Sequence, residues 1–261
     1  MTRPYPLRKR LPRRTFLGRV AASASALALA GCDNLSRTEW FPKVLNAVEP
    51  VNEAVAKLLG RKAMAQEFSD KDLSPQFRSN GSDDPGTDQY NAWVQNQFAD
   101  YTLMVGGLCE SPGKFTLAEL KAMPSRTQIT RHDCVEGWSA IGKWKGVRLS
   151  ALLDVVKPKP DARYVMFYCA DPMAQDGTDL YYESIDFDDA RHEQTVLAYE
   201  LNGQPLPVPN GAPLRLRVER QLGYKHAKFI TSIEFVSTFA KIAGGQGGYW
   251  EDQGYQWYAG I

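Results

Sequence analysis

The sequence predicts an α+β protein built on a mixed β-sheet. Segments at residues 163–169, 196–201 and 214–218 are β-rich, and each is either apolar throughout or alternates in polarity. The helix-like segments at 117–123 and 149–156 are short and unevenly spaced. Because helices and strands do not alternate regularly, the order favours an α+β architecture over a doubly wound parallel sheet.

The other elements follow from the same patterns. Residues 101–106 predict a strand, because its odd-numbered positions are apolar. Thr116 opens the helix at 117–123, and Glu119 stands at its third position, as in a capping box. Two further strands are predicted at 126–134 and 229–236, and a glycine-containing turn at 142–148 is expected to lead into the helix at 149–156.

Residues 1–31 predict an export signal. Arg13-Arg14 precedes Phe16-Leu17 and the apolar run 20–30, whose 11 residues are too few to span a bilayer as a helix. This arrangement resembles a twin-arginine signal, which exports proteins that have already folded, often around a cofactor. We therefore expect the mature protein in the periplasm.

Residues 29–32 (LAGC) resemble a lipoprotein cleavage site. Cys32 would then become the lipidated first residue of the mature chain, and several acyl chains would hold the protein on a membrane surface. The alternative is a small-residue cleavage site in which Cys32 is incidental. No later segment approaches the ~18 consecutive apolar residues of a membrane span, so we expect the body of the protein to be soluble.

The charge distribution argues against one class of function. Residues 1–31 hold seven of the 31 basic residues and no acids, which leaves 24 basic against 30 acidic residues and a net charge of −6. Nonspecific nucleic-acid binding needs a basic surface that displaces counterions from phosphates. The acidic body therefore predicts no nucleic-acid partner.

Beyond the signal, the sequence predicts an N-terminal arm at 32–74 and a main domain at 75–261. Valines at 44, 48, 51 and 55 are spaced by three and four residues, which predicts an amphipathic helix over 44–60. Turn residues dominate from Pro75 to Gly86. Among them Asn80-Gly81 is by itself a common turn dipeptide.

Cys134 is the centre of the most informative motif, residues 131–138 (RHDCVEGW), which follows a predicted strand. Arg131 and His132 are neighbours that stabilise a thiolate, and a thiolate is both a nucleophile and a metal ligand. The alternative is a buried structural cysteine. With Cys109 and Cys169 the mature body holds an odd number of cysteines beyond Cys32, so at least one lies outside an intramolecular disulfide. A disulfide between Cys109 and Cys169 is one open arrangement.

A second cluster, residues 210–218 (NGAPLRLRV) and 222–230 (LGYKHAKFI), predicts an anion site. Arg215, Lys225 and Lys228 gather positive charge around a glycine turn with free backbone N–H groups, which suits a phosphate. The alternative is a strand whose basic side chains face solvent.

Residues 134–139 (CVEGWS) resemble the Cys-Val-Glu-x-Trp-Ser segment of the sulfite-oxidase family of molybdopterin enzymes, in its periplasmic methionine-sulfoxide-reductase branch. The resemblance covers residues 75–238 and implies a sulfite-oxidase-type molybdopterin-binding domain. It implies molybdenum held by Cys134 and by the two dithiolene sulfurs of one pterin. It also implies a set of cofactor contacts from Asn80, Gly81, Asn210, Arg215, Lys225, His226, Ala227 and Lys228, and from Cys169, which stands where the family has Thr.

The resemblance implies transfer of an oxygen atom to or from a small-molecule substrate, with the chemistry supplied by the cofactor. His132 is then expected to hydrogen-bond the pterin and Arg131 to neutralise charge near the metal, although each could equally be a surface residue at a strand end. Residues 135–138 are acidic and aromatic where sulfite oxidases have arginines, which favours a neutral S-oxide or N-oxide over an anion. The chain has no Cys-x-x-Cys-His motif, so we expect a separate redox partner, such as a membrane haem protein.

Other functions remain open. One is a sulfite-type oxidase. Another is a cysteine hydrolase with Cys134 as the nucleophile and His192 or His226 as the base. A third is a non-catalytic periplasmic lipoprotein that keeps the fold.

Three groups have weaker predictions. The acids between residues 171 and 189 are expected to form a solvated face. Trp138 and Trp144 are expected to line a pocket. The aromatic, glycine-rich residues 244–258 are expected either to close over the domain or to meet a partner.

Overall fold

The computed structural model describes residues 63–174 and 179–261, with residues 37–41, 43, 44, 47, 48, 51, 54 and 55 of the N-terminal part. The predicted signal at 1–31 and Cys32 lie outside the described residues. The described residues from 40 to 55 are helical, although much of the helix predicted over 44–60 is not described. The chain divides into two compact units, Met1–Val55 and Ala56–Ile261. No helix in the described part of the chain has the length and apolar character to cross a membrane.

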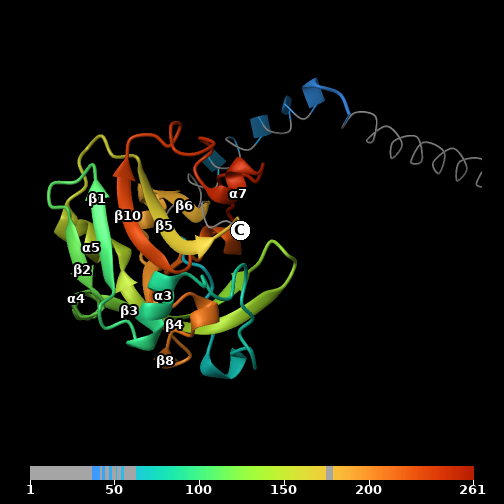
Figure 1. The fold of residues 1–261 in the computed structure, drawn as a ribbon. Helices are drawn as coiled ribbons and strands as arrows, with labels where there is room; N and C mark the ends of the chain where they lie inside the picture. The colour runs from blue at the N-terminus through green and yellow to red at the C-terminus, as the bar shows by residue number, and fades with distance from the viewer. Residues whose placement is uncertain are drawn as a thin grey trace, which may run out of the picture. The chain divides into compact units, whose positions relative to one another are not determined.

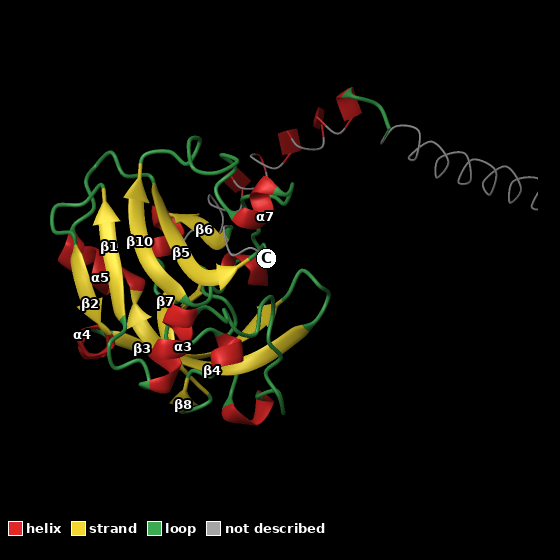
Figure 2. Cartoon of the chain, in the orientation of Figure 1, coloured by secondary structure: helices red, strands yellow, loops and turns green. Residues whose placement is uncertain are grey.

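The second unit contains two sheets (Figures 1 and 2). The first has the strand order β2–β1–β10–β5–β6, and its strands are β1 (Thr102–Gly107), β2 (Gly113–Thr116), β5 (Tyr164–Pro172), β6 (Leu180–Asp186) and β10 (Ile230–Val236). Strands β1 and β10 pair in parallel, whereas the other neighbours in this sheet are antiparallel. The predicted mixed sheet is thereby confirmed.

The second sheet is antiparallel and has the order β3–β4–β7–β8, with β9 also paired to β7. Its strands are β3 (Ser125–Asp133), β4 (Ser139–Arg148), β7 (Val196–Leu201), β8 (Gln204–Pro205) and β9 (Arg215–Arg217). The helical segments are short: α3 (Asp88–Gln95), α4 (Leu117–Ala122), α5 (Leu149–Val156), α6 (Phe187–Ala190), α7 (Tyr249–Asp252), and the 3₁₀ turns η1 (Asp70–Asp72), η2 (Val208–Asn210) and η3 (Gly223–Lys225). Few helices beside two sheets confirm the α+β class.

One hydrophobic core joins the two sheets. Leu103 of β1 and Phe167 of β5 belong to the same buried cluster as Leu197 of β7 and Leu216 of β9. Helix α5 buries a full face in this cluster through Leu149, Leu152, Leu153 and Val156, which follow the i, i+3, i+4, i+7 spacing. This shared core holds the ends of both sheets in fixed positions around the candidate site.

Several elements occur where the sequence predicts them. Helix α5 and strand β7 have the predicted bounds, and β1, β3, β5, β9 and β10 fall within a few residues of theirs. The capping box is also confirmed, because Thr116 Oγ1 accepts from the Glu119 amide at 3.2 Å and the Thr116 amide donates to Glu119 Oε2 at 2.8 Å. Local sequence is sufficient for these elements because their apolar periodicity matches their burial.

Strand β4 replaces the turn predicted at 142–148. Its glycines lie where other chain segments approach closely: a Cβ on Gly146 would come within 2.3 Å of the Leu197 carbonyl oxygen, and one on Gly142 within 2.8 Å of the Phe77 ring. These glycines therefore permit packing inside a strand and do not mark a turn.

The prediction of a solvated acidic face was wrong for three of its members. Asp171, Glu183 and Asp189 are buried, and Glu183 lies within β6. Their partners come from distant segments of the chain, for example Lys225 for Glu183 and Arg220 for Asp189. Buried carboxylates that find such partners are tolerated in a core.

Residues 63–74 of the predicted arm hydrogen-bond to the second sheet and to the loop before β7. The Phe68 amide donates to the Ile129 carbonyl at 2.9 Å, and the Ser74 amide donates to the Ile141 carbonyl at 3.0 Å. Gln194 exchanges two hydrogen bonds with the backbone of Ala65, at 2.7 and 3.0 Å. This part of the arm is therefore attached to the domain.

Candidate functional site

A cavity of about 160 Å³ brings together segments that are far apart in the sequence. Its lining includes Asn80, Cys134, Asp171, His226 and Lys228. Asn80 comes from the turn-rich segment before α3, Cys134 from the turn after β3, and Asp171 from the end of β5. His226 and Lys228 come from the connection between η3 and β10. The two motifs that the sequence singles out, around Cys134 and around residues 222–230, thus meet at one place.

Cys134 lies in a tight turn between the paired strands β3 and β4. The Cys134 amide donates to the Trp138 carbonyl at 2.9 Å, and the Gly137 amide donates to the Cys134 carbonyl at 3.0 Å. Gly137 has φ +85°, a left-handed conformation that a glycine adopts without strain. The turn therefore presents Cys134 to the cavity from a rigid hairpin.

The expectation that Arg131 and His132 stabilise a Cys134 thiolate was wrong for the protein alone. Burial raises the pKa of Cys134, and Glu136 adds to the rise, although backbone amides and Arg78 partly oppose it. The Arg131 side chain is exposed and pairs with Asp133 at 2.9 Å. The pKa of the thiol is therefore above its ordinary value in the protein alone, and coordination to a metal would lower it.

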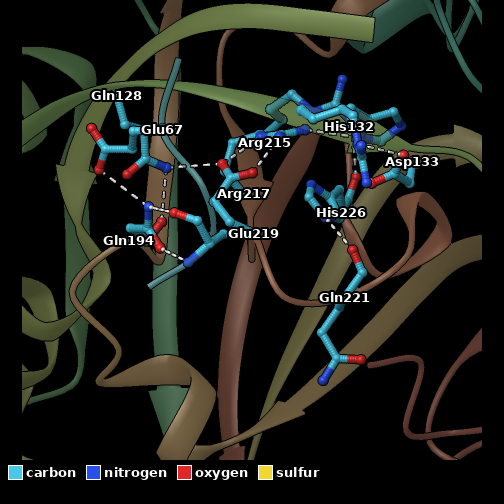
Figure 3. Close-up of polar contacts among 12 residues, drawn as sticks. Glu67, Gln128, His132, Asp133, Gln194, Arg215, Arg217, Glu219, Gln221 and His226 are labelled. Atoms are coloured by element: carbon cyan, nitrogen blue, oxygen red, sulfur yellow. Dashed lines mark hydrogen bonds and ion pairs between the residues drawn. The ribbon is translucent and has the colours of Figure 1, made fainter. Parts of the chain in front are cut away.

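His132 is buried and held by Arg217 (Figure 3). Arg217 Nη1 lies 2.9 Å from His132 Nδ1, and a guanidinium can only donate, so Nδ1 accepts and the proton is on Nε2. Burial, followed by the charge of Arg217, lowers the pKa of His132 well below its usual value. Arg217 is itself held by Glu219 through bonds of 2.9 and 2.5 Å. His132 is therefore a neutral N–H donor.

His226 has the opposite tautomer. Its Nε2 lies 3.0 Å from the Gln221 carbonyl oxygen, which can only accept, so Nε2 carries the proton and Nδ1 keeps a lone pair (Figure 3). Burial, followed by Arg217 and Arg215, lowers the pKa of His226 well below its usual value. The rings of His132 and His226 are perpendicular, with centroids 5.0 Å apart. Together they offer one N–H donor and one nitrogen acceptor.

Arg215 is fully buried and has no carboxylate partner among the described residues. It donates to the Asn210 carbonyl at 3.0 Å, to Asn80 Oδ1 at 3.3 Å and to the His226 carbonyl at 3.4 Å. Burial, followed by the nearby Arg217 charge, lowers the pKa of Arg215 to about 9. An unpaired buried guanidinium indicates that an anion belongs beside it.

Lys228 holds two loops over the cavity. Its Nζ donates to the Ser82 carbonyl at 2.5 Å, to the Pro209 carbonyl at 2.8 Å and to Ser79 Oγ at 3.3 Å. Burial, followed by Arg215, lowers the pKa of Lys228 to about 7. Asp171 supports the same segment by accepting from Ser82 Oγ at 2.7 Å. The loop with Asn80 and Gly81 is thereby fixed from both sides.

A second hollow of about 540 Å³ adjoins the cavity, because Gly81 and Glu136 line both. Pro209 and Asn210 also line this hollow. Trp138 and Trp144 line neither, and Trp144 is fully buried, with the guanidinium carbon of Arg217 4.4 Å from its ring centroid. Trp144 is therefore a platform for the two buried arginines.

Six sequence-predicted site residues line neither hollow: Arg131, His132, Cys169, Arg215, Lys225 and Ala227. His132 and Arg215 are buried. Lys225 is buried with its Nζ 2.5 Å from both Glu183 and Glu251. Cys169 and Ala227 belong to the hydrophobic core, and Arg131 points to solvent. Cys109, Cys134 and Cys169 are all free thiols, so the disulfide considered between Cys109 and Cys169 is absent among these described residues.

Sequence reasoning missed other members of the site. Arg217 and Glu219 fix the tautomer of His132, and Asp171 lines the cavity. Arg217 stands two residues after Arg215 in the same strand, and this spacing could have indicated that both face the same side. No comparable sequence signal exists for Asp171, because its partner Ser82 is 89 residues away.

The site has the features of a place for an anionic cofactor. Five polar atoms of the site are buried without a partner among the described residues: His132 Nε2, His226 Nδ1, Asn210 Nδ2, Arg215 Nε and Asp171 Oδ1. Such atoms are costly unless a ligand satisfies them. They lie with unpaired positive charge near a cavity-lining cysteine. A pterin that carries phosphate and dithiolene groups fits this set of hydrogen-bond donors and acceptors and the unpaired positive charge of Arg215. The described residues contain no cluster of three or more His, Cys, Asp or Glu that could hold a metal.

Fold and site together define a protein that binds an anionic cofactor beside a cysteine. Residues 91–241 match the family described as oxidoreductase molybdopterin binding domain. This match covers more than half of the chain, so the chain belongs to that family and is a molybdenum-dependent oxidoreductase with a molybdenum–pterin cofactor. The cysteine hydrolase is thereby excluded. In addition His192, one of its two candidate bases, is bonded to Ala63 and Gln194 away from the cavity lining.

Known proteins are similar to the chain over different lengths. The putative protein-methionine-sulfoxide reductase subunit YedZ1 of Azospira oryzae is 37% identical over 254 residues, which cover 95% of this chain and 87% of that protein. The protein-methionine-sulfoxide reductase catalytic subunit MsrP of Xanthomonas axonopodis pv. citri is 41% identical over 165 residues, or 60% of this chain and 51% of MsrP. The chain thus spans about half the length of MsrP. The sulfane dehydrogenase SoxCD of Paracoccus pantotrophus matches with a TM-score of 0.48 and 24% identity, over 54% of this chain and 39% of that one, which is too distant to bear on function.

Proposed function

We propose that this protein reduces a neutral S-oxide or N-oxide at a molybdenum centre that Cys134 ligates. The observation that carries the proposal is the position of Cys134, which faces a cavity next to buried, unpaired positive charge. A methionine sulfoxide, free or in a protein, is the preferred candidate, because the similar proteins are named as methionine-sulfoxide reductase subunits.

The cofactor, when bound, supplies two-electron oxygen-atom transfer. We assign the protein's part to particular residues. Cys134 Sγ is the metal ligand, Arg215 balances anionic charge, and His132 Nε2–H and Asn210 Nδ2–H donate hydrogen bonds to the pterin. His226 Nδ1 is left to accept one. Lys228 keeps the loop with Asn80 closed over the cofactor.

The preference for a neutral substrate rests on the charge of the cavity wall. Glu136 lines the cavity and lies two residues after Cys134 in the sequence. A carboxylate beside the reacting group repels a dianion such as sulfite. Trp138 Nε1 donates to Glu136 Oε2 at 2.9 Å, which fixes this carboxylate next to the Cys134 turn.

The test compares wild type with Cys134→Ser, with Cys169→Ser as the matched control because Cys169 is buried outside the cavity lining. We expect wild type and Cys169→Ser to contain molybdenum and to reduce methionine sulfoxide with an artificial electron donor. Cys134→Ser should lose both the activity and the metal-to-thiolate absorption. Full activity of Cys134→Ser would refute the ligand assignment, and oxidation of sulfite by wild type would refute the proposed substrate class.

We further propose that the protein is exported to the periplasm by the Arg13-Arg14 signal, is anchored by a lipid on Cys32, and receives electrons from a separate membrane partner. The similar proteins are named as subunits, which supports a partner. Replacing both arginines by Lys should leave the protein in the cytoplasm, and Cys32→Ser should release the exported protein from membranes. Unchanged fractionation of either variant would contradict the corresponding part of this proposal.

A further inference from the structure

The lining of the cavity beside Cys134 includes four aromatic residues, which we call the aromatic wall: Tyr181, Tyr224, Trp250 and Tyr255. Trp250 and Tyr255 are stacked, with ring centroids 5.3 Å apart and an interplanar angle of 28°. Tyr255 meets Tyr224 edge-on, also at 5.3 Å. These three rings therefore form one continuous apolar surface.

Trp250 and Tyr255 of the aromatic wall come from the C-terminal segment. Buried ion pairs among Lys225, Glu183 and Glu251, which we call the ion network, attach this segment to the domain. Lys225 Nζ lies 2.5 Å from Glu183 Oε1 and 2.5 Å from Glu251 Oε1. These three residues are at most 2% exposed. Burial alone would lower the pKa of Lys225, but the two carboxylates outweigh it and raise the pKa. The lysine thus stays charged and links β6, η3 and α7.

Residues of the ion network are direct neighbours in sequence of residues of the aromatic wall. Glu251 follows Trp250 in α7, and Lys225 lies between two cavity-lining residues, Tyr224 and His226. Moving either end of the Lys225–Glu251 contact would therefore move a ring of the wall. In Figure 1, α7 lies close to β6, whose residue Glu183 completes the network.

Hydrogen bonds along the rest of the segment hold it in the same place. The Ser184 hydroxyl of β6 donates to the Gly247 carbonyl at 2.5 Å and accepts from Trp257 Nε1 at 2.8 Å. The Tyr224 hydroxyl donates to the Gln256 carbonyl at 2.7 Å. Residues 247–257 are therefore held in place beside the cavity, which Trp250 and Tyr255 line.

We propose that Trp250 and Tyr255 bind the organic part of the substrate and select a neutral oxide with apolar arms, such as a methionine sulfoxide side chain, and that Lys225, Glu183 and Glu251 are positioning residues for this wall. Aromatic faces favour apolar groups and polarizable sulfur. Glu136 on the remaining lining disfavours an anion. The inference rests on the proposed function, because it places the substrate beside Cys134.

The first experiment measures binding by calorimetry to molybdenum-loaded enzyme without a reductant, so that no turnover occurs. The probes are three methionine sulfoxide derivatives that differ in charge: the neutral N-acetyl methyl ester, the anionic N-acetyl acid and the cationic methyl ester with a free amine. We expect the neutral probe to bind most tightly. Tightest binding of the cationic probe would show a cation–π site and overturn the neutral preference.

Variants of the wall then separate its role from folding. Trp250→Ala should weaken binding of the neutral probe by about tenfold and raise KM with little change in kcat, because the contact between the ring and the substrate is lost in ground and transition state alike. Trp250→Phe should bind nearly as wild type. Tyr249→Phe is the matched control, since Tyr249 lies in α7 but not in the cavity lining. Wild-type binding by a molybdenum-loaded Trp250→Ala would overturn the proposal.

A double-mutant cycle of Glu251 and Trp250 tests whether Glu251 positions the aromatic wall. Glu251→Ala should raise KM, and Glu251→Gln, which keeps a hydrogen-bond acceptor for Lys225, should raise it less. If Glu251 affects binding by positioning the Trp250 ring, the double variant Glu251→Ala with Trp250→Ala should have nearly the same KM as Trp250→Ala alone. Fully additive effects would overturn this role.

The two proposals fail in different ways. If wild type binds the neutral probe through Trp250 but reduces no S-oxide or N-oxide, the proposed function is refuted and the aromatic wall stands as a ligand site. If wild type reduces methionine sulfoxide and Trp250→Ala is unaffected, the function stands and the wall is refuted.

Discussion

At the scale of single residues, the buried arginines of β9 are alike in sequence and unlike in environment. Arg217 is paired with Glu219, whereas among the described residues Arg215 donates only to carbonyl and amide oxygens. An unpaired buried charge destabilises a protein until a counter-ion binds, whereas removing one member of a buried pair leaves the other unsatisfied. The two arginines should therefore respond in opposite ways to the same substitution.

We expect Arg215→Met to lose molybdenum cofactor on purification, while the cofactor-free form unfolds at the same temperature as cofactor-free wild type or higher. Arg217→Met should destabilise the cofactor-free form by about 3–5 kcal/mol, because Glu219 remains buried without a cationic partner and keeps only the hydrogen bond from Gln128. Molybdenum content and thermal melts of both forms check this. Equal destabilisation by both substitutions would contradict the assignment of Arg215 to the cofactor's charge.

At the scale of elements, His192 helps to attach residues 63–67 to the loop before β7, and its protonation is linked to folding. His192 Nε2 donates to the Ala63 carbonyl at 3.2 Å, and Nδ1 accepts from the Gln194 amide at 3.2 Å. Burial, followed by the charge of Arg220, lowers the pKa of His192 from 6.5. The unfolded chain therefore binds this proton more readily than the folded protein, so folding stability is present above pH 6.5 and is lost as the pH falls below it.

The measurement is the free energy of unfolding between pH 8 and pH 5 for wild type and His192→Gln. Below pH 6.5 we expect the free energy of unfolding to fall more steeply for wild type than for the variant, by up to about 1.4 kcal/mol per pH unit, because one proton is linked to unfolding. The difference between the two proteins isolates His192, since His132, His226 and the buried carboxyls titrate in both. Parallel curves would show that the pKa of His192 is the same in the folded and unfolded protein, and would contradict this prediction.

At the scale of the whole molecule, the candidate cofactor site lies where separate parts of the chain meet. Cys134 follows β3 of one sheet, Asp171 ends β5 of the other, and Trp250 belongs to α7. A ligand that binds only the folded state stabilises all of these parts together. Cofactor removal should lower the melting temperature by roughly 10 °C, given a ligand held at about a thousand times its Kd in a domain of this size.

This is checked by melting wild type from cells with and without molybdopterin synthesis, with Cys134→Ser as a third sample. The cofactor-free wild type and Cys134→Ser should melt at similar temperatures if the metal bond is needed to keep the cofactor. Identical melting of loaded and cofactor-free wild type would contradict a site that joins the sheets.

The sequence alone determined the family, the α+β class, most strands and the helix α5, because apolar periodicity and short motifs such as that around Cys134 are local properties. It also indicated that Arg215, His226 and Lys228 act with Cys134. It did not indicate β4 or β6, since the glycines of β4 serve close packing and Glu183 of β6 is neutralised by a residue 42 positions away. Only the tertiary structure decided that Lys225 faces Glu183 and Glu251, that Arg217 sets the tautomer of His132, and that Trp250 lines the cavity. Each of these depends on which distant side chain arrives beside it, and that is decided by the pairing of the sheets.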